Sequence, residues 1–219
     1  VFDWTIPEEW NIKDAYLQHS SGKKYAKFKD HNLHIVGYSI PQNRTIDFKD
    51  LSKRIYTIPK KPDWIPYHTT YYKKDWGFCM PQKEKDRMPK GKYKVFIDSS
   101  FKKGDLQYGE LFLRGQSKKE IFFSTYLCHP SMANNELSGP VLSTFLINYI
   151  KKNYKNPKFS YRFLFIPETI GSIAYLSKNF KKLKKNMLSG YVLSCVGDNR
   201  GFSHVESPTG LTVSDQSIK

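Results

Sequence analysis

The stretch Cys128-His-Pro-Ser-Met-Ala-Asn-Asn-Glu-Leu-Ser-Gly-Pro140 joins two apolar segments and decides how the surrounding chain folds. The segment before it, residues 121–127, is short and rich in Phe and Tyr, which predicts a buried strand. The segment after it, residues 141–150, predicts a helix with Ser138 as its N-cap and Pro140 in its first turn. Loops between a strand's carboxyl end and a helix carry the ligand sites of open α/β sheets. His129 is therefore the first candidate site residue.

The pattern repeats further along the chain. Residues 159–166 read as a strand, 170–179 as a helix, and 191–196 as another strand after the basic stretch 181–185. Alternating strands and helices predict βαβ units and a parallel sheet. Upstream, strand-like runs are separated by short links, which favour antiparallel neighbours; these runs cover residues 93–99, 104–113 and 120–126. We therefore expect an α/β fold, a mixed sheet with a parallel centre flanked by helices.

Residues 11–90 lack this alternation and predict a small inserted lobe that is β-rich and irregular. Residues 26–30 and 33–38 alternate apolar with polar side chains, as short strands do, and residues 47–55 fit one short helix. Prolines and aromatic rings crowd residues 62–79, where Pro excludes a helix. His68 lies in this segment and is a candidate for lining a cleft. The expected domains are 1–10 with 91–219, incomplete at both ends, and 11–90.

The composition narrows the class of protein. The 219 residues carry a net charge of +16, but the lysines fall in pairs along the whole chain and no nucleic-acid-binding motif accompanies them. This favours a solvated Lys-rich surface over a nucleic-acid partner.

Three widely spaced cysteines argue against a disulfide framework and for a reducing compartment, so we expect a cytoplasmic protein. No apolar stretch reaches the ~18 residues of a membrane span. The chain does not begin with Met, and we expect a piece of a longer protein.

Three strands of the predicted parallel sheet end in polar residues that could converge on one rim: His129, Glu168 and Asp198. One histidine and two carboxylates suit a metal hydrolase, in which a His and a carboxylate hold Zn²⁺ and a second carboxylate accepts the proton of a bound water. Asn135 and Glu136 could face the same rim or cap the helix. Asp198 could equally form a turn with its neighbours.

Longer motifs resemble a known family. The sequence from Tyr108 to Pro130 is similar to the strand pair that leads to the first metal-binding histidine of zinc aminopeptidases of the co-catalytic metallopeptidase type. More closely, four motifs resemble a bacterial branch of that family whose members carry an inserted small domain and a C-terminal winged helix, and often accompany surface-polysaccharide genes. These motifs are Phe-Asp-Trp-Thr-Ile-Pro-Glu-Glu-Trp-Asn-Ile, Tyr-Tyr-Lys-Lys-Asp-Trp-Gly-Phe-Cys, the stretch 128–140, and Ile-Pro-Glu-Thr-Ile-Gly-Ser-Ile-Ala-Tyr-Leu.

The resemblance implies roles for single residues. His129 matches the first zinc ligand, Glu168 matches the general base, and Asp198 lies near the next carboxylate ligand. At three positions this chain has a neutral residue where the peptidases have an acidic one. Ser131 replaces an Asp two residues after the histidine, Asn135 replaces the Asp that bridges the two metals, and Thr169 replaces a Glu that ligates a metal. Since an amide cannot supply the charge that holds two dications together, the resemblance implies at most one zinc ion.

The first hypothesis is therefore a single-metal, aminopeptidase-like hydrolase that acts on the amide of a small peptide or an N-acylated sugar. Its remaining ligands are expected in a C-terminal half, so that the site is incomplete in this fragment and the 219 residues alone are expected to be inactive. The second is an accessory or binding protein of surface-polysaccharide biosynthesis that keeps the fold without the chemistry. The substrate and any homo-oligomer are left open by the sequence.

Overall fold

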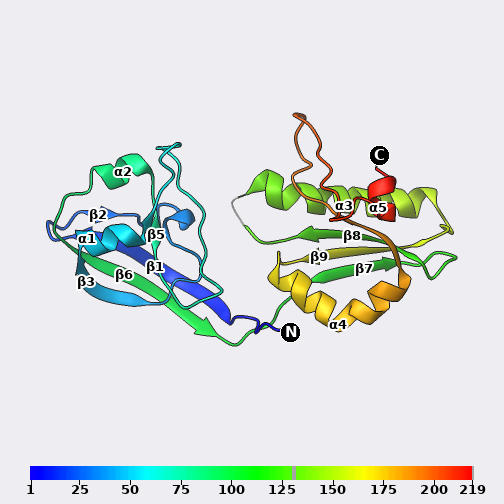
Figure 1. Ribbon diagram of the computed structural model, residues 1–219, viewed down its shortest axis with the longest axis horizontal. Coiled ribbons are helices and arrows are strands. Elements are labelled where there is room, and N and C mark those ends of the chain that lie inside the picture. Colours follow the sequence, from blue (N-terminus) through cyan, green and yellow to red (C-terminus); the bar gives the residue numbers. More distant parts are fainter. Residues whose placement is uncertain (130–131, 219) are drawn as a thin grey trace. The chain divides into compact units, whose positions relative to one another are not determined.

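The computed structural model describes residues 1–129 and 132–218, which form two compact units (Figure 1). One unit contains Val1–Ile6 and Leu106–Lys219, and the other contains Pro7–Asp105. Residues 7–10 and 91–105, which the sequence predicted within the α/β domain, belong instead to the unit Pro7–Asp105. Among the described residues, no helix has the length and apolar character needed to cross a membrane.

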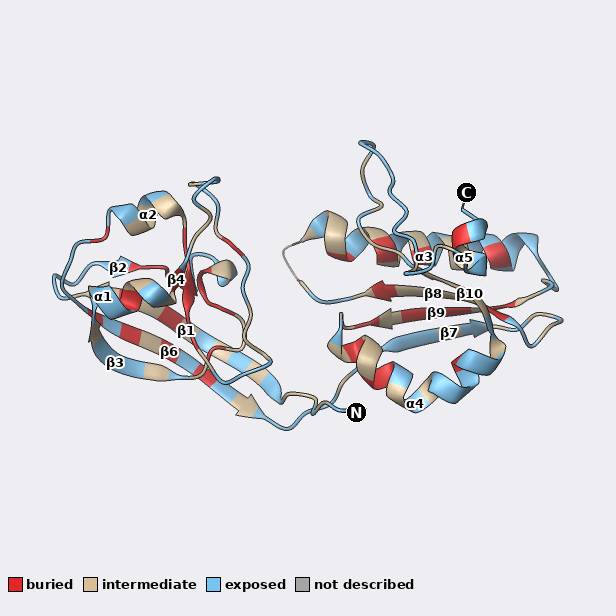
Figure 2. Cartoon of the chain, in the orientation of Figure 1, coloured by how far each residue is buried: buried red, intermediate tan, exposed pale blue. Residues whose placement is uncertain are grey.

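The unit Pro7–Asp105 is built on an antiparallel sheet with the strand order β2-β1-β6-β3. Buried and exposed residues alternate along β6, so one face of the sheet packs against a core that includes Leu17, Phe78, Tyr93 and Val95 (Figure 2). The elements are β1 Glu9–His19, β2 Lys24–Tyr25, η1 Asn32–His34, β3 Gln42–Asp47, α1 Phe48–Leu51, η2 Ser52–Arg54, β4 Ile55–Tyr56, β5 Phe78–Cys79, α2 Gln82–Asp86 and β6 Lys92–Lys102.

Two predictions about strands were wrong. Residues 26–30 and 33–38 are not strands, since β2 ends at Tyr25, Ala26 has a φ of 44°, and the His31 side chain caps the 3-10 helix η1. The three runs 93–99, 104–113 and 120–126 are not successive antiparallel neighbours either. Strand β6 pairs with β1 and β3 instead, because its alternating face is buried by residues of its own unit.

The other unit confirms the predicted fold class. Its sheet has the order β10-β8-β9-β7, in which β10, β8 and β9 are parallel and β7 is antiparallel at the edge. The steps β8-α3-β9 and β9-α4-β10 run in opposite directions across the sheet, so right-handed crossovers put the two long helices on opposite faces (Figure 1). The elements are β7 Gly109–Leu113, β8 Glu120–Tyr126, α3 Ala133–Asn153, β9 Ser160–Ile166, α4 Ile170–Asn186, β10 Met187–Val192 and α5 Val213–Gln216.

Helix α3 begins at Ala133, so the prediction of Ser138 as its N-cap was wrong. The Ser138 hydroxyl lies inside the helix, where it donates to the Asn134 carbonyl and accepts the backbone N–H of Val196. The earlier start brings residues 133–137 into the helix and fixes the positions of Asn135 and Glu136. Helix α4 likewise extends to Asn186 and includes the basic stretch 181–185, whose cations suit a helix carboxyl terminus.

Helix α3 is held close to the sheet at Gly139. A Cβ atom at this position would lie 2.2 Å from both the Leu193 carbonyl and the Thr125 hydroxyl, far inside van der Waals contact. Only a residue without a side chain allows the helix to approach the end of β8 this closely. The first turn of α3 is thereby brought beside the loop that follows β8.

A buried ion network joins three strands of the same sheet. Arg162 on β9 donates to both carboxylate oxygens of Glu120 on β8, at 2.6 and 3.0 Å, and both side chains are only 3% exposed. Arg162 also pairs with Glu110 on β7, whose second oxygen accepts the Tyr175 hydroxyl at 2.9 Å. Sequence patterns did not predict this network, because Arg162 lies within an apolar run.

Candidate metal centre

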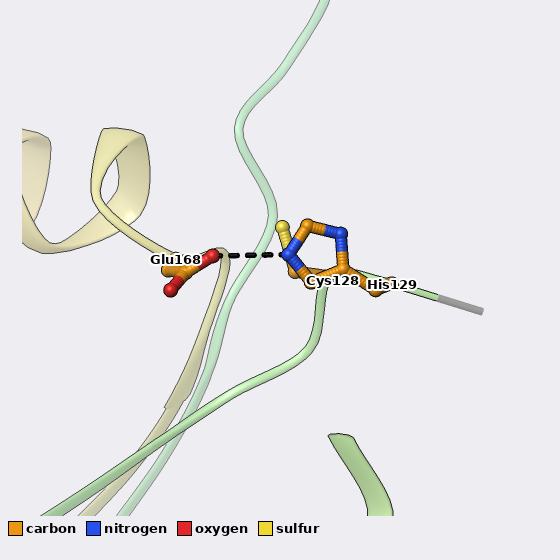
Figure 3. Close-up of side chains that lie close together, drawn as sticks. All are labelled: Cys128, His129 and Glu168. Atoms are coloured by element: carbon orange, nitrogen blue, oxygen red, sulfur yellow. Dashed lines mark hydrogen bonds and ion pairs between the residues drawn. The ribbon is translucent and has the colours of Figure 1, made fainter. Parts of the chain in front are cut away.

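The carboxyl ends of β8 and β9 bring the first two candidate residues together. These strands are parallel neighbours, with Tyr126 opposite Ile166 and the Leu127 amide donating to the Ile166 carbonyl at 3.0 Å. His129 and Glu168 each follow their strand by a few residues. Their side chains meet: His129 Nε2 lies 3.1 Å from Glu168 Oε2 (Figure 3).

Cys128 completes a group of potential metal donors. One donor atom from each of Cys128, His129 and Glu168 lies within 4.8 Å of the other two (Figure 3). Partial desolvation of its sulfur raises the pKa of the Cys128 thiol. The carboxylates of Glu136 and Glu168 raise this pKa further, while a hydrogen bond from the Glu168 backbone lowers it. The sequence interpretation did not single out Cys128, although its position directly before His129 and the affinity of thiolates for zinc were signals for it.

Glu136 contributes a second buried carboxylate. The residue is 5% exposed, and its Oε2 accepts the backbone N–H of Cys128. Its Oε1 is buried without a hydrogen-bond partner among the residues that the structure describes, and it lies 4.0 Å from His129 Nε2. A buried carboxylate oxygen that accepts no hydrogen bond is costly unless a cation offsets it. The residues around His129 therefore fit a metal ion.

Asn135 lies one residue earlier in helix α3. Its Nδ2 donates to the Tyr126 hydroxyl at 3.1 Å, and its Oδ1 is also buried without a partner in the described part of the chain. An amide oxygen can ligate a metal but carries no net charge. Asn135 therefore cannot supply the charge of the metal-bridging acid that the resemblance implies at this position.

Asp198 is engaged by other groups. Its Oδ2 accepts Asn134 Nδ2 at 2.9 Å and pairs with the Arg200 guanidinium, while its Oδ1 accepts the Arg200 amide at 3.0 Å. These donations from Arg200 lower the pKa of the Asp198 carboxyl. The hydrogen bond to the Arg200 amide is that of an Asx turn. Within the described residues, the group of donors around His129 does not include Asp198, and its role as a ligand stays a prediction.

Three further positions complete the comparison with the sequence. His68 belongs to the unit Pro7–Asp105, where it is exposed and its ring centroid lies 4.4 Å from that of Tyr56. Ser131 lies outside the described residues. Thr169, which directly follows Glu168, has a φ of 51°, an outlier for a β-branched residue. Backbone strain of this kind clusters at functional sites, here next to the Glu168 side chain.

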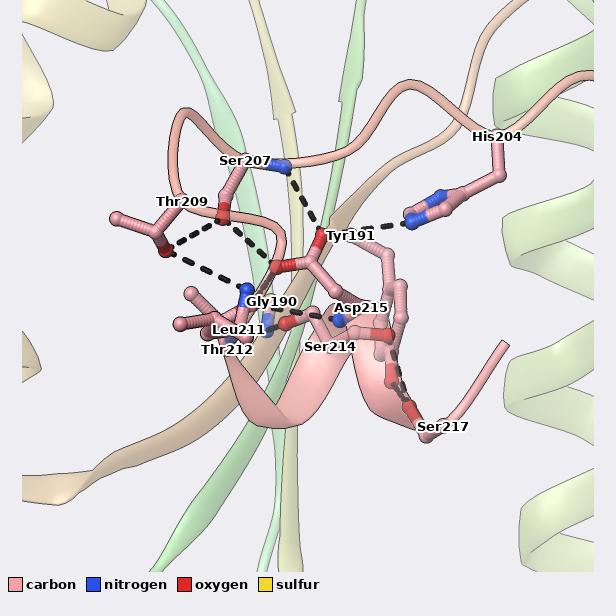
Figure 4. A network of polar contacts seen from close by, with 10 residues as sticks. All are labelled: Gly190, Tyr191, His204, Ser207, Thr209, Leu211, Thr212, Ser214, Asp215 and Ser217. Atoms are coloured by element: carbon pink, nitrogen blue, oxygen red, sulfur yellow. Dashed lines mark hydrogen bonds and ion pairs between the residues drawn. The ribbon is translucent and has the colours of Figure 1, made fainter. Parts of the chain in front are cut away.

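A second polar cluster, near the end of the chain, contains the residue types of a hydrolase triad but not its geometry. The Ser207 hydroxyl donates to Asp215 Oδ2 at 2.7 Å, and His204 Nε2 lies 3.4 Å from Asp215 Oδ1 (Figure 4). The serine and the histidine thus both face the carboxylate, whereas a triad requires a histidine between the other two. Asp215 also forms a capping box with Thr212, so the cluster secures helix α5 and the preceding loop.

Comparisons with known proteins place the chain in a family. A family model described as "Domain of unknown function (DUF4910)" matches residues 1–219. A Clostridium acetobutylicum protein described as "Putative polysaccharide biosynthesis protein with aminopeptidase-like domain" is 50% identical over 198 residues, which cover 90% of this chain and 45% of the relative. The chain therefore spans less than half the length of this relative.

Solved structures confirm the predicted aminopeptidase-like fold. The crystal structure of a "putative peptidase" from Clostridium acetobutylicum is 50% identical with a TM-score of 0.79, covering 90% of this chain and 46% of that one. A zinc aminopeptidase from Bacillus subtilis is 13% identical with a TM-score of 0.61, covering 89% and 58% of the two chains. An aminopeptidase from Aneurinibacillus sp. strain AM-1 is 14% identical with a TM-score of 0.51, covering 88% and 59%.

Proposed function

Since the chain belongs to the family described as "Domain of unknown function (DUF4910)" and has an aminopeptidase-like fold, we propose that it carries the metal centre of a hydrolase that cleaves amide bonds. The observation that supports this most strongly is the pairing of His129 Nε2 with Glu168 Oε2 at 3.1 Å, at the carboxyl ends of parallel strands. In this proposal His129 holds one zinc ion and Glu168 is the general base.

The zinc ion and the Glu168 carboxylate have separate tasks in the proposed hydrolysis. A bound zinc ion lowers the pKa of a water molecule and polarises the amide carbonyl. Glu168 has a side chain that is 43% exposed, so its carboxylate can accept a proton from water and deliver it to the leaving amine. The strained backbone at Thr169 helps to fix the position of this carboxylate. Because Asn135 stands in place of the acid that would bridge two ions, this scheme uses a single ion.

We propose a small peptide or an N-acylated sugar as the substrate. Both contain an amide that such a centre can hydrolyse, and the sugar would suit the polysaccharide role in the name of the Clostridium acetobutylicum relative. Because the chain spans 45% of that relative, residues elsewhere in the complete gene product are expected to complete the substrate site.

Assays of the complete gene product test this function. Amino-acid anilides report aminopeptidase activity, and N-acetylated hexosamines report deacetylation. We expect hydrolysis of one class, loss of the activity after removal of metal by a chelator, and recovery when zinc is restored. Hydrolysis that persists at full rate in metal-free protein would contradict the proposal. Stoichiometric zinc without hydrolysis of either class would favour an accessory protein instead.

A further inference from the structure

Neutral residues stand at two positions where the resemblance implies acidic groups around the metal, so negative charge beside His129 depends on other side chains. Asn135 and Thr169 are both neutral. Two groups that can carry negative charge remain beside His129, apart from Glu168. They are the Cys128 sulfur, within 4.8 Å of the His129 and Glu168 donor atoms, and the Glu136 Oε1, 4.0 Å from His129 Nε2.

The Glu136 carboxylate is oriented as a ligand would be. Its Oε2 is fixed by the backbone N–H of Cys128, which leaves Oε1 directed toward the His129 ring. The side chain is 7% exposed, so water has little access to it. Two ligands on one tetrahedral zinc lie roughly 3–4 Å apart, given metal–ligand bonds of about 2.0–2.3 Å. Glu136 Oε1 and His129 Nε2 can therefore share an ion after a small adjustment.

Glu168 has a different environment from Glu136. Its side chain is 43% exposed, whereas that of Glu136 is 7% exposed. A general base must reach a water molecule and then a leaving group, which suits an exposed carboxylate. A ligand is stabilised by burial beside the cation, which suits Glu136. The two carboxylates near His129 thus fit different tasks.

We propose that Cys128 Sγ and Glu136 Oε1 join His129 Nε2 as ligands of a single divalent ion, with Glu168 left free to act as the base. The inference rests on the proposed function only in that the centre takes a metal. A thiolate–imidazole–carboxylate set suits a thiophilic cation such as Zn²⁺ or Co²⁺ over Mg²⁺. Binding displaces the proton of the Cys128 thiol to solvent.

Cobalt reports thiolate ligation without any assay of activity. The metal-free complete gene product is titrated with Co²⁺, and a thiolate-to-cobalt charge-transfer band is expected in the near ultraviolet at one equivalent. Cys128→Ser should abolish the band. Cys195→Ser is the matched control, because Cys195 is an exposed cysteine of the same unit that lies outside the donor group; its band should be unchanged.

Glu136→Gln tests the carboxylate separately. It keeps the size of the side chain but removes the charge, and we expect cobalt binding to weaken at least about 10- to 100-fold, since even groups that only support a ligand are worth that much. The thiolate band should persist at saturating cobalt, and far-ultraviolet circular dichroism checks that helix α3 is intact. Unchanged cobalt affinity in a folded Glu136→Gln variant overturns the role of Glu136.

The inference is also overturned if the complete gene product binds no cobalt, if the band survives Cys128→Ser, or if Cys195→Ser removes it. These failures differ from a failure of the proposed function. A thiolate band in a protein that hydrolyses no amide leaves the ligand set intact and removes the activity. Metal-dependent hydrolysis without a thiolate band leaves the activity intact and removes this ligand set.

Discussion

Replacing Glu168 by Gln is expected to slow amide hydrolysis by the complete gene product about 10²- to 10⁴-fold, the contribution of a positioned general base. Gln keeps the shape of the side chain, but it cannot accept a proton from water. The loss should therefore fall on kcat, with little change in KM. Steady-state kinetics with the substrate found for the wild-type protein provides the measurement.

Two controls separate this effect from damage to the site. Glu206→Gln makes the same chemical change at an exposed residue that lies outside the donor group, and its rate should equal that of the wild-type protein. The metal content of Glu168→Gln should also be unchanged, because Glu168 is proposed as the base and not as a ligand. Undiminished hydrolysis by Glu168→Gln would remove this residue from the mechanism.

Replacing Arg162 by Ala is expected to lower the free energy of unfolding by about 3–5 kcal/mol, the cost of removing one partner of a buried ion pair. Arg162 and Glu120 are each 3% exposed and share two hydrogen bonds, so the variant leaves the Glu120 charge buried without its partner. Urea denaturation monitored by circular dichroism measures the change, with the midpoint shifting and the slope unchanged.

Arg114→Ala is the matched control for this measurement. Arg114 is an exposed arginine of the same unit, and its replacement should change the free energy of unfolding by no more than about 0.5 kcal/mol. The double variant Arg162→Met and Glu120→Leu removes both charges and should recover much of the lost stability. Equal stability of Arg162→Ala and Arg114→Ala would show that the network contributes nothing.

The sequence predicted the part of the site that depends on sheet topology. Alternating strands and helices indicated parallel neighbours, and parallel strands end on one rim, so His129 and Glu168 were expected together. The environment of Asp198 could not be predicted in the same way, because the partner Asn134 lies in a helix whose start was placed too late, at Ser138. For the same reason the orientation of Glu136 was not predicted, because it depends on the first turn of α3.

Other differences arise from contacts between residues that are distant in sequence. Short links between strand-like runs gave no information on pairing, since β6 is joined to β1 and β3 by contacts distant in sequence. Arg162 interrupts an apolar strand and was not recognised as part of a network, because its partners Glu110 and Glu120 belong to two other strands. Cys128 was visible beside His129, but its distance to Glu168 follows only from the fold.

Elemental analysis of the complete gene product, purified with zinc and freed of loosely bound ions, tests most directly whether a single ion is held at His129. The wild-type protein is predicted to retain one zinc ion per chain, and His129→Ala is predicted to retain almost none. Two zinc ions per chain in the wild-type protein, or an unchanged zinc content in His129→Ala, would contradict the single-metal centre.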